Sequence, residues 1–274
     1  MELVDTHCHI QSIDESSGEK ATSQLWTKRG GSSLSDVIDR ATANHVNKLI
    51  VVGCSLADSQ LACRVAGSSD HTWASVGIHP HEAKDHVRDK QALNKFKDLV
   101  KQPKVVAIGE CGLDYYYQHS QRADQIKILQ FQLSLAIDHD LPLIFHVRQA
   151  FDDFWPIFDS HNSLEHPIRG VLHSYTDNHK NLELALERKL YIGINGIATF
   201  NKNPELTDVY TRIPLNNLLL ETDSPFLTPA PIRGTINEPK NIRLIAEYLA
   251  GLRGEEIGQL AKSTTNNARK LFCL

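Results

Sequence analysis

The chain has 274 residues, of which 41% are hydrophobic and 23% charged, the composition of a globular protein with a substantial core. Its formal net charge of −4 argues against strong nonspecific binding to duplex DNA, which needs many Lys and Arg contacts to phosphates. The sequence contains neither a long apolar run nor a basic segment followed by an apolar one. We therefore expect no transmembrane helix, no secretory signal and no association with a membrane.

The five cysteines are scattered, odd in number and without a Cys-x-x-Cys pair. This usage is typical of reduced thiols, so we expect a cytoplasmic protein. No Gly-rich motif for a nucleoside triphosphate or a dinucleotide occurs, and no nucleotide cofactor is expected. The sequence leaves the oligomeric state open.

Eight short apolar runs recur along the chain with room for a helix between them. The β-branched pairs Val51-Val52 and Val105-Val106 favour strands over helices. Eightfold alternation of strand and helix predicts a single-domain (β/α)8 TIM-like barrel of parallel strands over residues 1–274. The predicted strands are residues 2–8, 48–54, 73–78, 104–110, 141–147, 169–174, 190–196 and 217–223.

Three stretches show the clearest helical patterns. Residues 121–139 carry an apolar stripe of Ile126, Leu129, Leu133 and Ile137 at close to helical spacing. A second helix is predicted over residues 239–252, with Pro239 in its first turn. A short last helix, capped by Ser263 or Thr264, is predicted to end near Leu271.

Residues 11–33 follow the first predicted strand and are rich in Ser, Gly, Lys and Glu. They are interpreted as a loop insertion on the carboxyl-terminal face of the barrel, where active sites occur. Two interpretations remain open, a surface loop without a specific role and a lid or substrate guide.

Imidazoles and carboxylates recur at the ends of the predicted strands. His7 and His9 alternate along the first strand and would point the same way, as a pair of metal ligands should. In a barrel, the carboxyl ends of all strands converge on one pocket. The candidate metal ligands are His7, His9, Glu110, His146, His173 and Asp223.

Histidine and carboxylate ligands suit Zn²⁺ or Mn²⁺, and an oxygen-rich variant suits Mg²⁺. Six ligands exceed what one tetrahedral zinc takes from protein, whereas two ions bridged by a carboxylate would use them all. Paired metals generate a hydroxide and stabilise the oxygens of an in-line phosphoryl displacement. The alternative is that each histidine is an ordinary hydrogen-bonded core or surface residue.

Asp223 is also a candidate general base, because a carboxylate beside a metal can orient a water and accept its proton. Its alternative role is that of a pure ligand. Glu221 lies two residues before Asp223, and Asp5 two before His7, so each would share a strand face with a ligand. We expect each carboxylate to hold a ligand histidine in position without binding the metal itself.

Other polar residues near the strand ends are candidates for substrate binding. His79 and His81 follow the third strand and would contact a substrate phosphate or orient water. Arg148 would clamp a phosphate bidentately. The alternatives are loop structure around Pro80 and a surface salt bridge of Arg148. Residues 115–117 are three tyrosines, which either stack on nucleobases or pack on the barrel rim.

Several motifs, in order and over nearly the whole chain, resemble those of the TatD family of metal-dependent hydrolases. They are Asp5-Thr6-His7-Cys8-His9, Gly77-Ile78-His79-Pro80-His81, Gly109-Glu110-Cys111-Gly112-Leu113-Asp114-Tyr115, Phe145-His146-Val147-Arg148, His173-Ser174, Leu220-Glu221-Thr222-Asp223-Ser224-Pro225, Arg233-Gly234 and Asn237-Glu238-Pro239.

The resemblance implies an amidohydrolase-like barrel and a divalent-metal phosphodiesterase that acts on DNA. It assigns His7, His9, Glu110 and Asp223 to one metal and Glu110, His146 and His173 to the other, with Glu110 as the bridge. Glu110 and Asp223 would be the catalytic residues. The implied reaction is 3′-5′ exonucleolytic cleavage of single-stranded DNA ends by a metal-bound hydroxide.

Two alternatives stay open at this point. The same site could cleave an ester or amide, as a D-aminoacyl-tRNA deacylase does, because barrels of this kind use similar metal-bound water. The other alternative is a metal-binding or scaffold protein without catalysis, against which the retention of every ligand speaks.

Overall fold

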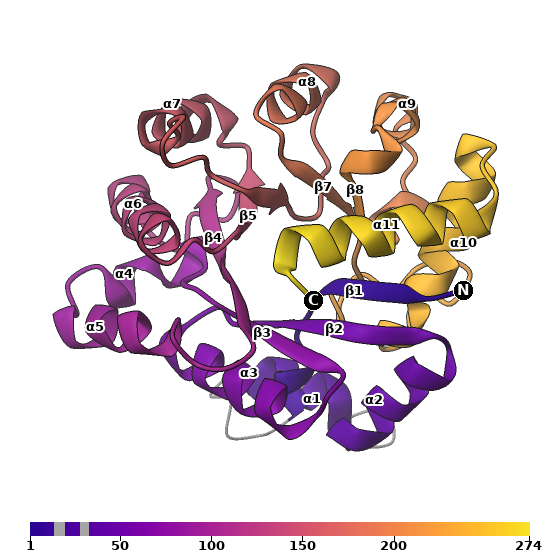
Figure 1. Cartoon of the computed structure of the whole chain (residues 1–274), viewed down its shortest axis with the longest axis horizontal. Helices are drawn as coiled ribbons and strands as arrows, with labels where there is room; N and C mark the ends of the chain where they lie inside the picture. Colours follow the sequence, from indigo (N-terminus) through magenta and orange to yellow (C-terminus); the bar gives the residue numbers. More distant parts are fainter. Residues whose placement is uncertain (14–19, 28–32) are drawn as a thin grey trace. The chain divides into compact units, whose positions relative to one another are not determined.

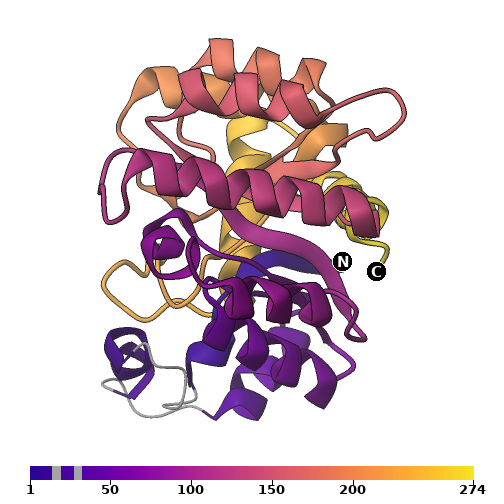
Figure 2. The same cartoon turned by 90° about the vertical axis from the view of Figure 1, so that its left-hand side faces the viewer.

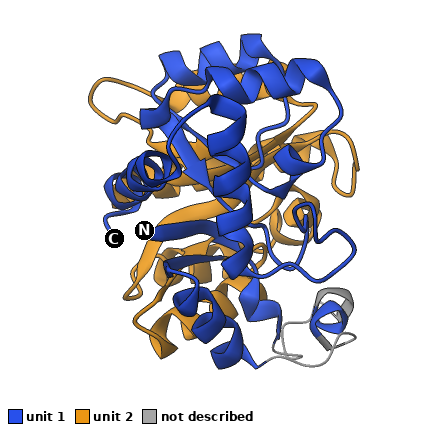
Figure 3. Ribbon diagram, turned by 90° about the vertical axis from the view of Figure 1, so that its right-hand side faces the viewer, with its two compact units in different colours: residues 1–51, 174–274 blue, residues 52–173 orange. Residues whose placement is uncertain are grey.

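The computed structural model describes residues 1–13, 20–27 and 33–274, which divide into two compact units (Figure 3). Unit 1 comprises residues 1–51 and 174–274, and unit 2 comprises residues 52–173. Unit 1 therefore contains both ends of the chain. The strands form an eight-stranded sheet whose order follows the chain from β1 to β8, and every predicted strand is present.

Unit 1 holds two parallel strand pairs, β1 with β2 and β7 with β8. A parallel bridge between Cys8 and Ser224 continues β1 beyond its end. All six residues of β1 are buried, so both faces of this strand contribute to the interior. The strands are β1 (Leu3–Cys8), β2 (Val46–Val52), β7 (Tyr191–Ile194) and β8 (Leu218–Leu220).

The last two helices cover the strands of unit 1. Helix α11 packs on β1 and β8, and α10 packs on β1 (Figure 1). The buried Ile245 and Leu249 of α10 and Leu260 and Leu271 of α11 form the apolar faces. The helices of unit 1 are η1 (Ile10–Ile13), α1 (Lys20–Thr27), α2 (Leu34–Ala43), α8 (His179–Glu187), η4 (Gly196–Thr199), α9 (Pro204–Arg212), η5 (Leu215–Asn217), η6 (Pro239–Asn241), α10 (Ile242–Arg253) and α11 (Ile257–Phe272).

Unit 2 contains the four middle strands, which pair in parallel as β3 with β4, β4 with β5 and β5 with β6. Helix α3 packs on β3, and the long helix α6 runs across β4 (Figure 2). The strands are β3 (Thr72–Val76), β4 (Val105–Asp114), β5 (Leu143–Arg148) and β6 (Gly170–Leu172), and the helices are α3 (Leu56–Ser68), η3 (Pro80–Glu82), α4 (Ala83–His86), α5 (Lys90–Leu99), α6 (Arg122–His139) and α7 (Phe151–His161).

Several predicted boundaries were wrong. Strand β8 ends at Leu220, so Asp223 follows the strand instead of ending it. Strand β4 continues to Asp114, because Cys111 to Asp114 pair in register with β5, and Glu110 therefore lies inside the strand. The last helix begins at Ile257, so Thr264 is interior, where its hydroxyl donates to the carbonyl of Leu260. Pro239 opens a 3-10 turn, and the α-helix starts at Ile242.

The predicted insertion over residues 11–33 is described only in part. Its described portions include most of η1 and the whole of α1, where the Trp26 indole donates to the Ser12 hydroxyl. The parts of the predicted loop at 14–19 and 28–32 lie outside the described residues. Among the helices that are described, none is long and apolar enough to cross a membrane.

Candidate metal centre

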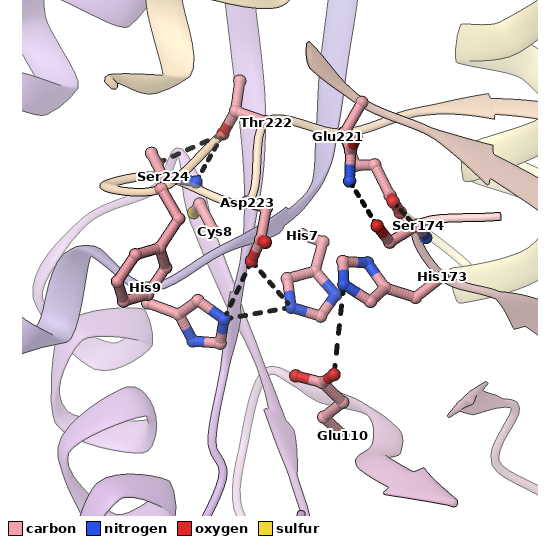
Figure 4. Close-up of polar contacts among 12 residues, drawn as sticks. His7, Cys8, His9, Glu110, His173, Ser174, Glu221, Thr222, Asp223 and Ser224 are labelled. Carbon is pink, nitrogen blue, oxygen red and sulfur yellow. Dashed lines mark hydrogen bonds and ion pairs between the residues drawn. The ribbon is translucent and has the colours of Figure 1, made fainter. Parts of the chain in front are cut away.

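In unit 1, two imidazoles and a carboxylate converge at the end of β1 (Figure 4). The Nε2 atoms of His7 and His9 lie 3.1 Å apart. Oδ1 of Asp223 is 3.3 Å from Nε2 of His9 and 3.8 Å from Nε2 of His7. Two ring nitrogens and a carboxylate oxygen directed at one small volume are the donor set that Zn²⁺ or Mn²⁺ takes from proteins.

Backbone bonds between β1 and the segment after β8 hold this first cluster. The N–H of Asp223 donates to the carbonyl of His7, and the N–H of His9 donates to that of Ser224. Asp5 accepts from the backbone N–H groups of His7 and Thr222 and from the Thr222 hydroxyl. Its burial raises the pKa of the Asp5 carboxyl to about 7, although the bonds from Thr222 and His7 lower it. Asp5 thus ties together the two segments that carry ligands.

Glu221 is buried and accepts a hydrogen bond from the backbone N–H of Ser174 (Figure 4). The residue facing it on β7 is Gly193, where a Cβ would overlap the carboxylate. A glycine at this point of the strand therefore makes the space that Glu221 occupies. The hydrogen bond joins Glu221 to the backbone of the residue that follows His173 in sequence.

In unit 2, three histidine rings lie around the carboxylate of Glu110. Its Oε1 atom lies 2.9 Å from Nδ1 of His146, 3.5 Å from Nε2 of His79 and 3.9 Å from Nε2 of His173. The Glu110 side chain is only 6% exposed. Its other oxygen, Oε2, accepts a weak bond from the Cys54 thiol at 3.7 Å. Glu110, His79 and His146 form a second group with metal-binding geometry.

Asp114 is a functional candidate that sequence reasoning missed. It is fully buried, and its Oδ2 atom lies 3.0 Å from Nε2 of both His81 and His146. Its Oδ1 atom accepts from the backbone N–H groups of Tyr116 and Tyr117. The signal was available, because residues 110 and 114 differ by an even number and share a strand face once β4 extends that far.

Charge and burial set opposite pKa shifts in this second cluster. Burial raises the pKa of Asp114, but the bonds from His146 and His81 outweigh it and hold that pKa well below its usual range. Burial lowers the pKa of His146, but its bonds with Asp114 and Glu110 dominate and raise it. For His79, burial dominates and lowers the pKa, which favours the neutral ring that can bind a metal.

The three predicted substrate-binding residues all lie in unit 2. The rings of His79 and His81 are 4.3 Å apart, and His79 also contacts the ring of His146. The Arg148 guanidinium is stacked 4.2 Å from the ring centre of Tyr116 and 4.8 Å from that of Tyr117. The structure thus brings His79 into the second cluster and places Arg148 on an exposed tyrosine pair.

Gly112 lets β4 and β5 approach beside His146. It has φ of 148°, and a Cβ there would overlap the backbone oxygen of His146. We expect Gly112→Ala to lower the free energy of unfolding by about 2–3 kcal/mol, because neither backbone has room to move. Urea unfolding followed by circular dichroism measures this. The control is Gly67→Ala in α3, where a Cβ meets nothing within 4 Å. Equal stability of the two variants would contradict the packing argument.

The sequence matches one protein family over residues 4–273, described as TatD related DNase. It is 32% identical to the "uncharacterized metal-dependent hydrolase YabD" of Bacillus subtilis, over 98% of both chains. It is 34% identical to the "3′-5′ ssDNA/RNA exonuclease TatD" of Salmonella typhimurium, over 86% of this chain and 92% of the relative.

Solved structures agree with the fold. The TatD homologue YjjV of Escherichia coli superimposes with a TM-score of 0.85 at 28% identity, over 99% of this chain and 98% of the other. A phosphotriesterase homology protein of Escherichia coli, 14% identical, shares the fold with a TM-score of 0.67 over 99% of this chain and 98% of the other. Together with the strand order, these similarities confirm the predicted (β/α)8 TIM-like fold of the amidohydrolase-like type.

Proposed function

Because the chain belongs to the TatD family of metal-dependent hydrolases, we propose that it hydrolyses phosphodiester bonds at the 3′ ends of single-stranded DNA. The observation that carries the proposal is that imidazoles gather around a carboxylate in each unit, at Asp223 and at Glu110. Paired divalent ions suit phosphoryl transfer, because they can stabilise both the attacking and the leaving oxygen. The exonuclease name of the Salmonella relative supports the polarity and the single-stranded substrate.

We assign His7, His9, Glu110 and Asp223 to one ion and Glu110, His146 and His173 to the other. The match to the family over residues 4–273 and the order of the motifs in the sequence support this assignment. The donor chemistry fits, because the ligands are imidazole nitrogens and carboxylate oxygens. This mixed set suits Zn²⁺ or Mn²⁺, and its carboxylate oxygens also suit Mg²⁺. When bound, such ions would lower the pKa of a water molecule and polarise the phosphate.

The protein's own groups then have distinct tasks. We assign proton acceptance to Asp223, whose carboxylate lies beside His9 and whose side chain keeps 16% of its surface exposed. Glu110 supplies the shared negative charge. Asp5 and Glu221 hold the backbones of His7 and Ser174. These bonds keep the ligand-bearing segments in place before substrate arrives.

On the substrate side, His81 and Arg148 present their side chains near the second cluster. His81 is bound to Asp114, so its orientation is fixed, and its ring is partly exposed. Arg148 can donate two parallel hydrogen bonds to a phosphate while its plane rests on Tyr116. A locally cationic surface of this kind lets a chain of net charge −4 bind a polyanion.

The test is incubation of the metal-loaded protein with a 5′-labelled single-stranded oligonucleotide. We expect a ladder that shortens from the 3′ end with Mg²⁺ or Mn²⁺ and none with EDTA. Intact oligonucleotide with metal demonstrably bound would contradict the proposal. Aminoacyl-tRNA and small esters and amides, assayed in parallel, would then show whether the site cleaves those bonds instead.

Removal of the metal should also weaken the fold. The ligands of the first cluster lie on segments far apart in sequence, and an ion joining them would stabilise only the folded state. At a metal concentration about 100 times Kd, we expect stabilisation of about 2.7 kcal/mol, lost on chelation. Differential scanning calorimetry with EDTA and then with excess Mn²⁺ measures the fall and recovery of Tm. An unchanged Tm in metal-free protein would contradict metal binding at these clusters.

A further inference from the structure

Unit 2 contains a cavity of about 490 Å³, lined by side chains in and just after α4, by the loop that follows β4 and by the start of α6. Three of its lining side chains are cationic, those of Lys84, Arg88 and Arg122, against one carboxylate, that of Asp124. The three cationic residues are exposed. Within the described part of the chain, no ion pair is recorded for Lys84 or Arg88. The cavity therefore carries an excess of positive charge that the fold leaves available to an anion.

Two further features of the cavity favour the binding of an anion. Helix α6, of 18 residues, begins at Arg122, and the side chain of its N-cap residue Gln121 caps no backbone N–H among the described residues. The positive end of the helix therefore adds to the cationic lining. The Arg122 guanidinium lies 4.1 Å from the ring centre of Tyr115, whose hydroxyl donates to Asp153. This packing holds Arg122 in place.

A continuous set of ring contacts leads from the second cluster to the cavity. The ring of His81 lies 4.3 Å from His79 and 4.5 Å from His119, and His119 lines the cavity. Tyr117 stacks on His119 with an interplanar angle of 19°. Tyr117 is 51% exposed, as suits a ring that contacts a passing strand.

We propose that this cavity binds backbone phosphates of the nucleic-acid strand whose terminal nucleotide is hydrolysed, as a subsite beyond the scissile bond. The inference rests on the proposed function and deepens it. Arg and Lys side chains at an open helix N-terminus recognise phosphate oxygens without reading bases. Tyr117 and His119 would line the path between the subsite and the metal-binding histidines. A substrate with several phosphates then binds more tightly than a dinucleotide.

The test uses the double variant Lys84→Ala/Arg88→Ala in the full-length, metal-loaded protein. Fluorescence anisotropy measures its binding to a labelled single-stranded oligonucleotide with non-hydrolysable phosphorothioate ends. We expect Kd to rise about tenfold and the slope of log Kd against log salt to fall by about 0.7 per lost phosphate contact. In turnover, KM for the oligonucleotide should rise, with kcat unchanged. A dinucleotide should show no change, because its one phosphodiester is the scissile bond and it has no further backbone phosphate to place in the cavity.

The matched control is Lys90→Ala/Lys127→Ala, which removes two exposed positive charges of unit 2 outside the cavity. Equal loss of affinity in both double variants would overturn the subsite, because net charge alone would explain it. Unchanged affinity in Lys84→Ala/Arg88→Ala, with wild-type protein that still cleaves DNA, would overturn the subsite and leave the proposed function intact. Binding that depends on the cavity, without any hydrolysis, would support phosphate binding in the cavity and refute the proposed phosphodiesterase activity.

Discussion

Glu110→Gln is expected to lower kcat for metal-dependent hydrolysis by at least about 1,000-fold. Oε1 of Glu110 lies within 3.9 Å of ring nitrogens of His79, His146 and His173, so the carboxylate is the centre of the second cluster. Glutamine keeps the size of the side chain but removes the charge that a shared ligand needs. Turnover of a single-stranded oligonucleotide gives kcat, and atomic emission gives the metal bound per chain.

Glu165→Gln serves as the control, because it makes the same change at an exposed position of unit 2. It should leave both kcat and metal content at the wild-type level. A Glu110→Gln protein that is folded, carries a full complement of metal and turns over at nearly the normal rate would rule out Glu110 as a bridging ligand.

Asp114→Asn is expected to lower the free energy of unfolding by about 3 kcal/mol or more, because it breaks a buried set of charged hydrogen bonds. The fully buried carboxylate joins the rings of His81 and His146 to the backbone at Tyr116 and Tyr117. With the ring of His146 no longer oriented, activity should also fall about 10- to 100-fold. Urea unfolding of metal-free protein separates the effect on stability from that on turnover.

Asp98→Asn is the matched control, since the Asp98 side chain is 82% exposed and its ion pair with Lys101 is on the surface. Its effect should stay within about 0.5 kcal/mol. If Asp114→Asn unfolded at the same urea concentration as Asp98→Asn, the Asp114 contacts would not be the restraint that their geometry indicates.

The order of the strands could be predicted from sequence because each strand has its own apolar run, with room for a helix in the intervals between them. The six candidate ligands could be selected from sequence because they stand at the ends of the predicted strands. The structure places His7, His9 and Asp223 in one cluster. It places His146 and His173 around a second carboxylate, that of Glu110. The assignment of these residues to individual ions remains a proposal.

The errors have two physical causes, of which the first is pairing between residues distant in sequence. The length of β4 depends on continued pairing of Gly112 with His146 and of Asp114 with Arg148, which no local pattern encodes. A glycine and a charged residue after an apolar run are also typical of a turn, so the strand was predicted to end at residue 110. The second cause is local. Hydroxyl residues favour helix starts, which is why Thr264 was predicted to be a cap, but inside a helix the hydroxyl can also donate to a carbonyl one turn earlier.

The division of unit 1 between the two ends of the chain bears on when the protein can acquire metal during synthesis. Asp5 and Thr222, whose hydrogen bonds fix the first cluster, are 217 positions apart. At about 5–20 residues per second, a ribosome that has made β1 needs at least about ten seconds to reach Asp223. Until then, any part of β1 that has left the ribosome lacks the Asp223 carboxylate that pairs with His7 and His9. On the proposed ligand assignment, metal binding at the first cluster would therefore require the completed chain and not the nascent one.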